Sequence, residues 1–246
     1  MIIVKKNAIV INDLLGFKNI KIIQNKDYFN FSLDSVLVPN FAKLNKNTKK
    51  IVDLCTGNAP IPLILSTKTD AKITGFEIQK EIYELSEETI KLNNLEDKIK
   101  IINDDIKNIF NYYKSDTVDL ITCNPPYFEI NDQTLRNENE VKTNARHETL
   151  IKLEDIVIIS RKLLKNGSPL VMVHRTERLS EIIVLFKQNN IEPKRVRFVY
   201  PKINSESNLV LIEGIKNGRK GMKVEKPLIV HNENGEYTEE ILKMFE

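Results

Sequence analysis

A four-residue turn, Asn124-Pro125-Pro126-Tyr127, contains the residues that could most clearly carry out chemistry. Each proline lacks an N–H and forces the preceding residue into an extended conformation, so the turn is stiff and rich in carbonyls. The side-chain oxygen of Asn124 and the carbonyl of Pro125 can therefore face a ligand as two acceptors. If they hold the hydrogens of an exocyclic amino group, its lone pair is freed to attack a methyl donor placed in line.

Two aromatic residues, Tyr127 and Phe128, can stack on a planar base that enters the site. This scheme needs no strong general base, because the nitrogen becomes acidic only after it is methylated and water can take the proton. We therefore predict that Asn124, Pro125, Pro126 and Tyr127 form the catalytic centre. As a bare string of four residues, the motif could equally be a rigid strand-to-loop turn.

Three acidic or turn features stand at the ends of predicted strands: the segment 53–60 with Asp53, Cys55 and Gly57, then Glu77, then Asp104-Asp105. In open parallel sheets, ligands bind beyond the carboxyl ends of the strands. Gly57 lets the backbone approach a ligand closely, and Glu77 can accept both hydroxyls of a ribose. The set predicts a pocket for an adenosine. It has no phosphate-binding lysine or glycine run, which favours an adenosine that carries a methionine over a nucleoside triphosphate.

Apolar strands alternate with helical patterns from residue 50 onward, and these elements must position the site. We expect strands over 50–54, 73–77, 99–102, 118–122, 169–174, 196–200 and 208–215, and helices over 60–66, 82–92, 106–112, 150–164 and 179–186. This alternation predicts a parallel sheet covered on both faces, with an antiparallel hairpin at one edge. The expected fold is α/β, Rossmann-like and seven-stranded, with residues 1–49 as an N-terminal extension and 50–246 as the main domain.

The composition is that of a globular protein: 246 residues, 41% hydrophobic and 29% charged. No apolar run approaches the ~18 residues of a membrane span, and the N-terminus lacks the order of a signal peptide, so we expect a cytoplasmic protein. Cys55 and Cys123 are too few for a disulfide scaffold and lack zinc-site spacing. No metal site is expected.

Basic residues are concentrated in the C-terminal half, although the net charge is only +3. Arg161, Lys162 and Lys165 lie close together, and two later clusters are Lys194, Arg195 and Arg197, and then Lys216, Arg219, Lys220 and Lys223. Such clusters can contact nucleic-acid phosphates. The alternative is that they are solvated faces of a lysine-rich protein.

With these motifs in place, the chain resembles class I methyltransferases that carry an (N/D)PP(Y/F) motif. More closely, it resembles the bacterial tRNA1(Val) adenine-N6 methyltransferases over nearly its whole length. Residues 31–38 resemble the segment that lines the methionine end of the cofactor, and 53–60 resembles the first cofactor motif. Cys55 and Ala59 depart from the family pattern, because glycine is usual at both positions.

The resemblance implies S-adenosylmethionine as the cofactor and an adenine beside the anticodon, adenine 37 of tRNA1(Val), as the target. Loop bases of this kind are unstacked at low cost and read by stacking and edge contacts. The implied cofactor residues are Asp34, Asp53, Cys55, Gly57, Glu77, Ile78, Asp105, Ile106 and Asn124. The basic clusters become candidates for phosphate contacts, and Arg146 becomes a candidate for closing a loop over the bound base.

Other functions remain open at this level. Protein-glutamine N5-methyltransferases share Asn-Pro-Pro-Tyr, but their helical N-terminal domain needs more than residues 1–49. Ribosomal RNA guanine-N2 methyltransferases have a similar motif. A non-catalytic module that binds the cofactor or RNA is the third alternative, although the intact turn argues against it.

Overall fold

A single large sheet forms the centre of the molecule in a computed structural model that describes residues 9–14, 17–26, 32–127 and 151–245. The strand order is β10-β8-β9-β7-β6-β3-β4-β5, and β11 pairs with β8. The strands are β3 (Lys50–Leu54), β4 (Lys72–Glu77), β5 (Ile99–Asn103), β6 (Leu120–Cys123), β7 (Pro169–Arg175), β8 (Ile191–Lys202), β9 (Leu209–Lys216), β10 (Lys223–Val224) and β11 (Leu228–His231).

The predicted fold class is confirmed. Strands β3 to β7 pair in parallel, and β9 runs antiparallel to both β7 and β8. The central strands are apolar almost throughout because both faces of the sheet are covered; Ile51, Val52 and Leu54 of β3, for example, have no exposed surface.

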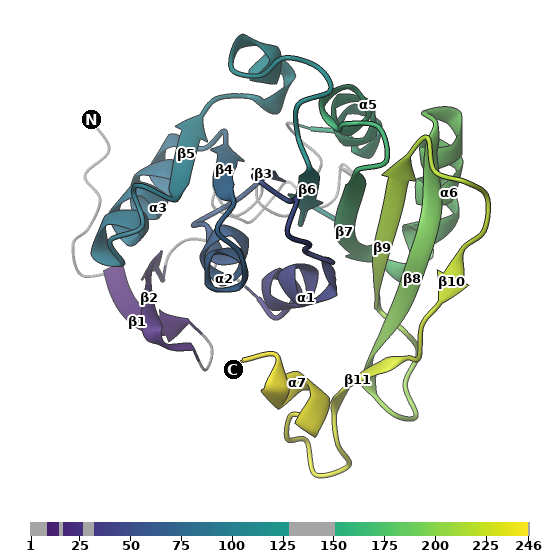
Figure 1. Cartoon of the computed structure of the whole chain (residues 1–246). Coiled ribbons are helices and arrows are strands. Elements are labelled where there is room, and N and C mark those ends of the chain that lie inside the picture. The colour runs from purple at the N-terminus through teal and green to yellow at the C-terminus, as the bar shows by residue number, and fades with distance from the viewer. Residues whose placement is uncertain (1–8, 15–16, 27–31, 128–150, 246) are drawn as a thin grey trace, which may run out of the picture.

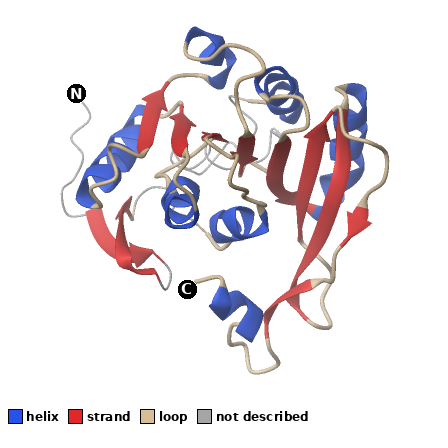
Figure 2. Ribbon diagram, in the orientation of Figure 1, coloured by secondary structure: helices blue, strands red, loops and turns tan. Residues whose placement is uncertain are grey.

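Helices cover the two faces of the sheet as separate layers (Figures 1 and 2). One layer contains α1 (Asp34–Phe41), α2 (Pro60–Lys68) and α3 (Lys80–Leu92), and the other contains the 3-10 helix η2 (Ile106–Asn111), α5 (Leu153–Leu163) and α6 (Leu179–Gln188). Pro60 stands at the first position of α2, where a missing N–H costs no hydrogen bond. A short 3-10 turn, η3 (Thr176–Arg178), precedes α6.

Several elements were not predicted. A hairpin of β1 (Ile9–Leu14) and β2 (Phe17–Asn25) packs against α3, where the Ile23 N–H donates to the Thr89 hydroxyl. The short strands β10 and β11 extend the sheet beyond the seven expected strands, and α7 (Glu239–Lys243) brings Ile241 into the same apolar cluster as α1. The strands β10 and β11 are too short for a periodic pattern to reveal them.

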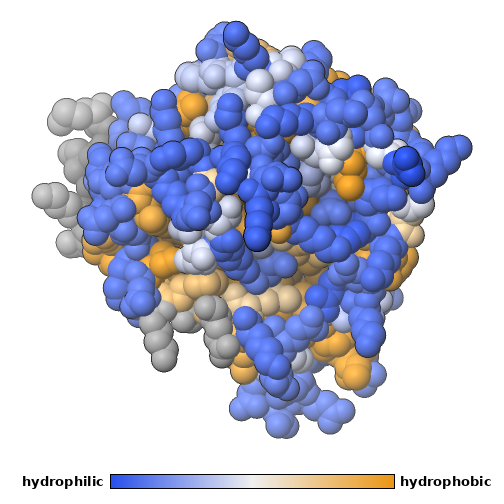
Figure 3. Space-filling model, viewed as in Figure 1, coloured by the Kyte–Doolittle hydropathy of each residue, from blue (hydrophilic) through white to orange (hydrophobic). Residues whose placement is uncertain are grey.

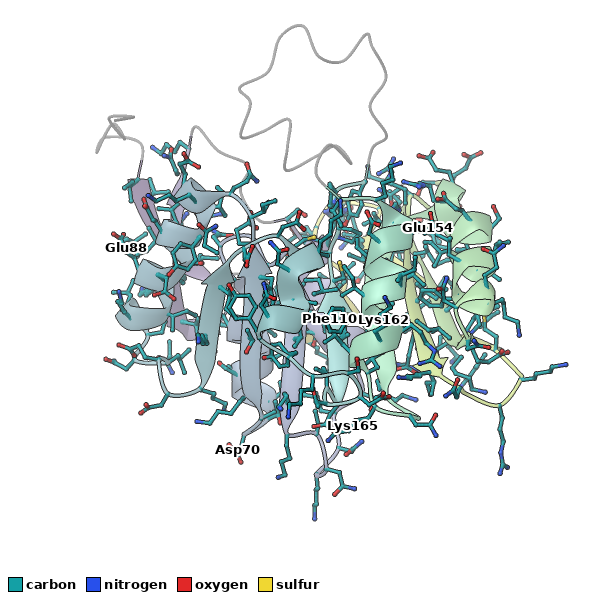
Figure 4. All side chains as sticks on the ribbon, turned by 90° about the horizontal axis from the view of Figure 1, so that it is seen from above. Asp70, Glu88, Phe110, Glu154, Lys162 and Lys165 are labelled. Atoms are coloured by element: carbon teal, nitrogen blue, oxygen red, sulfur yellow. The ribbon has the colours of Figure 1, made fainter. Side chains whose placement is uncertain are left out.

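The direction of the parallel strands defines two edges of the sheet. Strands β3, β4, β6 and β7 all end at one edge, here called the carboxyl edge, and begin at the other, the amino edge. In Figure 4, Asp70 and Lys165 lie toward the amino edge and Glu154 toward the carboxyl edge. The face shown in Figure 3 is mostly hydrophilic with small hydrophobic patches, and no helix in the described part of the chain could cross a membrane.

Candidate functional site

A pocket of about 960 Å³, its open mouth included, lies at the carboxyl edge where β3, β4 and β6 end. It is lined by seven of the nine residues predicted to bind the cofactor: Cys55, Gly57, Glu77, Ile78, Asp105, Ile106 and Asn124. The sheet therefore brings these residues together from three strand ends and the turn after a fourth.

Glu77, at the end of β4, is the acidic centre of the pocket and is only 6% exposed. Its carboxylate accepts hydrogen bonds from the N–H of Gly57 at 3.0 Å and from the N–H of Gln79 at 2.9 Å. Burial raises the pKa of Glu77, and these backbone donors oppose the rise. A carboxylate oxygen can accept more than one hydrogen bond, so Glu77 can also accept from a ligand hydroxyl such as one of a ribose.

The loop between β3 and α2 has an unusual backbone. Cys55, Gly57 and Ala59 have φ angles of 57°, 59° and 69°. Every second residue from 55 to 59 therefore has a left-handed backbone conformation. This conformation favours glycine, which explains why the residues at 55 and 59 stand out in the sequence; a side chain there costs about 1–2 kcal/mol. The loop keeps its shape because Thr56 N–H donates to the Phe76 carbonyl, and the Asn58 amide donates to the Ile23 carbonyl of β2.

Asp53 does not contact the pocket, and its predicted role as a cofactor ligand is wrong. It has no exposed surface, and its two oxygens each accept a hydroxyl, from Thr56 and from Thr122, both at 2.6 Å. Thr122 is its partner across the pairing of β3 and β6. Burial raises the pKa of Asp53 to about 7. Asp53 therefore links the ends of β3 and β6 to the loop between β3 and α2.

The remaining lining suits an adenosine. Ile78 and Ile106 offer apolar surfaces that can contact a planar base, and Asp105 lies beside them at the start of η2. The Gln79 Oε1 atom is buried and has no hydrogen-bond donor among the described residues, so it is free to accept from a ligand hydroxyl or amino group. Within the described ranges, no group of three or more potential ligands is placed to hold a metal ion.

The Asn-Pro-Pro-Tyr turn follows β6 and forms one wall of the pocket through Asn124 and Pro126. The Asn124 amide nitrogen donates to the Ser35 hydroxyl of α1 at 3.1 Å, and its oxygen, Oδ1, faces the Tyr127 hydroxyl. The Tyr127 hydroxyl lies 2.5 Å from this oxygen and 2.8 Å from Asp34 Oδ2. Asp34 was predicted to bind the cofactor, but it faces Tyr127 and does not line the pocket. Its role as a cofactor residue therefore stays a prediction.

His174 lies behind the turn, with its ring 5.4 Å from the Tyr127 ring. It has no exposed surface, and its Nδ1 accepts from the Arg175 N–H at 2.8 Å. Burial lowers the pKa of His174 to about 4, so it is neutral at physiological pH. Its Nε2 atom has no partner within the described residues.

Three of the basic residues predicted to contact phosphates form ion pairs with acidic residues within the fold. Arg195 is 7% exposed and donates to Glu213, Glu225 and the Phe41 carbonyl. Lys216 is 2% exposed and pairs with Asp116. The prediction is wrong for both, since a buried, paired cation cannot reach a phosphate. Arg197 is paired with Glu240 at 2.7 Å.

The other basic residues lie away from the pocket. Lys194 donates to the carbonyls of Arg219 and Gly221. Arg219 and Lys220 are exposed but follow the end of β9, which pairs with the first residues of β7 and β8 and so ends at the amino edge. The structure does not bring them to the carboxyl edge, so we correct their assignment as substrate contacts. Phe128 and Arg146 lie outside the described residues.

Sequence reasoning missed three residues that shape the site: Ser35, Asn58 and Gln79. Ser35 accepts from the Asn124 amide, Asn58 joins the loop to β2, and Gln79 presents an open acceptor. Ser35 and Asn58 stood inside segments already singled out, so their polar side chains were the available signal. The position of Gln79, two residues after Glu77, gave no signal in the sequence that it belongs to the site.

Comparison with known proteins agrees with this geometry. The model of the methyltransferase small domain family matches residues 33–182. A tRNA1(Val) (adenine(37)-N6)-methyltransferase of Flavobacterium psychrophilum is 23% identical over 232 residues, covering 94% of this chain and 97% of the relative. A protein of the same name from Haemophilus influenzae is 26% identical, covering 93% and 94%. The crystal structure of a predicted O-methyltransferase from Agrobacterium tumefaciens shares the fold, with a TM-score of 0.70 and 17% identity over 86% of this chain and 95% of that one.

The matched segment begins just before α1, includes the pocket loop, Glu77 and the Asn-Pro-Pro-Tyr turn, and ends within α6. It covers more than half of the chain and all of the described pocket residues. The chain belongs to the methyltransferase small domain family.

Proposed function

We propose that this protein transfers a methyl group from S-adenosylmethionine to N6 of an adenine in tRNA, and that the target is adenine 37 in the anticodon loop of tRNA1(Val). One observation carries the proposal. Asn124 lines the pocket, and its side-chain oxygen accepts a hydrogen bond from Tyr127 of the same turn. A methyl donor in the pocket and an amino group at the turn would thus meet at the same residue.

The pocket residues fit the cofactor in a defined order. Glu77 would accept the ribose hydroxyls, Asp105 would accept from the adenine amino group, and Ile78 with Ile106 would contact the base. The Gly57 backbone would approach the cofactor closely, with Cys55 beside it. When bound, S-adenosylmethionine supplies an electrophilic methyl group on a positively charged sulfur.

The turn would hold the acceptor nitrogen. Asn124 Oδ1 and the Pro125 carbonyl can each accept one hydrogen of an exocyclic amino group, which favours a tetrahedral nitrogen with an available lone pair. The Tyr127 ring can stack on the target base. Holding the nitrogen in place supplies much of the rate without a separate catalytic group.

The relatives support tRNA as the substrate, because full-length proteins of similar length are named as tRNA1(Val) methyltransferases. An anticodon loop offers unstacked bases that can enter a pocket at low cost. Contacts with its phosphates should come from the carboxyl edge, where the site opens. Lys202 is exposed at the end of β8 and lies at this edge.

The test is methyl transfer from labelled S-adenosylmethionine to three acceptors in parallel: total RNA, a tRNA1(Val) transcript and a peptide release factor. We expect label in total RNA and in the transcript. Label in the release factor alone would replace the proposal with a protein-glutamine methyltransferase, and label only in ribosomal RNA guanine would point to the guanine-N2 enzymes. Cofactor binding without transfer to any acceptor would indicate a binding module.

A further inference from the structure

We infer that Asp34 is a catalytic residue that accepts the second hydrogen of the target amino group and then takes its proton. The inference rests on the proposed function and deepens it, because it assigns a base to a reaction for which the sequence suggested none. It also replaces the cofactor-binding role that resemblance gave to Asp34.

Two acceptors converge on one point beside the pocket. The Tyr127 hydroxyl oxygen lies 2.5 Å from Asn124 Oδ1 and 2.8 Å from Asp34 Oδ2. The Asn124 amide nitrogen donates to Ser35 on the other side, so its oxygen faces this point. A donor at this point therefore meets an amide oxygen and a carboxylate oxygen.

A hydroxyl matches this pair of acceptors poorly. It has one hydrogen, which can be fully shared with only one of the two oxygens. A primary amino group has two hydrogens and could satisfy Asn124 and Asp34 together. We conclude that the Tyr127 hydroxyl occupies the place of the substrate nitrogen and withdraws when the base enters.

Asp34 is well placed to act as a base. It stands in the first turn of α1, beside Ser35. Burial is the largest influence on Asp34 and raises its pKa, while the bond to Tyr127 and the charge of Arg175 lower it. A carboxylate with a raised pKa holds a proton more readily than an exposed one.

The electron and proton balance is simple. The nitrogen lone pair forms the new N–C bond, while the electron pair of the broken C–S bond stays on sulfur. The nitrogen then carries a positive charge, the new methyl group and both original hydrogens. One of these protons passes to the Asp34 carboxylate, which leaves a neutral methylamino group, and the protonated Asp34 later releases its proton to water.

Two variants separate the role of Asp34 as a hydrogen-bond acceptor from its role as a base. Asp34→Asn keeps an acceptor oxygen but cannot take a proton at neutral pH, whereas Asp34→Ala can do neither. Asp70→Asn serves as a matched control, because Asp70 is fully exposed at the amino edge. Three quantities are measured: the cofactor Kd, the single-turnover rate with cofactor and RNA both saturating, and the Kd of an anticodon stem-loop with adenine or with purine, which lacks the amino group, at the target position.

We expect the single-turnover rate of Asp34→Asn to fall about 100-fold, a usual loss when a general base is removed. The cofactor Kd should change less than about threefold, which is smaller than the loss of one hydrogen bond would cause. Wild type and Asp34→Asn should both bind the adenine stem-loop more tightly than the purine stem-loop, and Asp34→Ala should lose much of this preference. Asp70→Asn should match wild type in all three.

The pH dependence adds a second signature. The wild-type rate should rise with pH as Asp34 ionises, and the rate of Asp34→Asn should not. The groups that face the site are Tyr127, whose pKa burial raises well above its usual value, Arg175, whose charge lowers the pKa of Asp34, and His174, whose pKa burial lowers to about 4. Tyr127 keeps its proton and His174 is neutral between pH 5 and 8, so neither accounts for a change of rate in this range.

Two results would overturn the inference. One is a raised cofactor Kd in Asp34→Asn with a normal rate once cofactor is saturating, which would make Asp34 a cofactor residue. The other is an unchanged rate and an unchanged preference for adenine in Asp34→Ala. If wild type instead methylates the release factor, the proposed function fails, and the same variants test Asp34 on the glutamine amide. If no acceptor is methylated, the Kd values of the adenine and purine stem-loops still test whether Asp34 contacts the target amino group.

Discussion

The amide nitrogen of Asn124 lies 3.1 Å from the hydroxyl oxygen of Ser35 in helix α1, and its amide oxygen faces the Tyr127 hydroxyl instead. Without this bond, the amide could rotate and present a donor where the reaction needs an acceptor.

Ser35→Ala should therefore slow methyl transfer. We expect the single-turnover rate at saturating cofactor to fall about fivefold to tenfold, which corresponds to about 1 kcal/mol for one lost hydrogen bond. Ser86→Ala, at a buried serine of α3, is the control and should leave the rate unchanged. An unaltered rate in Ser35→Ala would show that Asn124 keeps its orientation by other means.

Glu77→Gln should weaken cofactor binding. The amide offers fewer acceptor positions than the carboxylate and loses its charge, so we expect the Kd measured by calorimetry to rise about tenfold to 100-fold, or about 1.5–3 kcal/mol. The control Glu88→Gln changes an exposed residue of α3 and should not alter the Kd. Equal affinity in Glu77→Gln and wild type would remove Glu77 from the cofactor site.

Asp53 should make the stability of the protein depend on pH. Its folded-state pKa is raised to about 7, above an ordinary value of about 3.9, so the folded state favours the protonated form. This contribution is complete below about pH 4 and is lost as the pH rises through 7, with an upper limit of about 4 kcal/mol. Asp53→Asn cannot titrate, so its free energy of unfolding should vary less than that of wild type between pH 5 and 8 in urea denaturation. Parallel curves for the two proteins would mean that Asp53 is ionised in the folded state throughout.

The structure also predicts which lysine meets RNA. Lys202→Glu, at the carboxyl edge, should weaken binding of tRNA about fivefold or more at physiological salt and reduce the salt dependence of binding. Lys220→Glu changes the net charge by the same amount at the amino edge and should have a much smaller effect. Filter binding measures the tRNA affinity of the two variants. A larger loss of affinity in Lys220→Glu would indicate that tRNA binds at the amino edge.

This contrast explains where sequence reasoning succeeded and where it failed. Glu77, Asp105 and Asn124 could be placed together because each follows an apolar strand, and parallel strands end at one edge. Arg195 and Lys216 looked like members of basic clusters, but their partners Glu213 and Asp116 are distant in the sequence. Charge can be read from a sequence, whereas pairing and the edge on which a residue lies depend on strand register. Ser35 and Asp34 show the same limit, because their bonds to the turn join segments about 90 residues apart.

The most direct test of the account is nucleoside mass spectrometry of a tRNA1(Val) transcript after incubation with S-adenosylmethionine and either wild type or Asn124→Ala. The account predicts N6-methyladenosine at position 37 with wild type and none with Asn124→Ala, although calorimetry should show that the variant still binds the cofactor. A methyl group on another nucleoside, or N6-methyladenosine formed at the wild-type rate by Asn124→Ala, would contradict it.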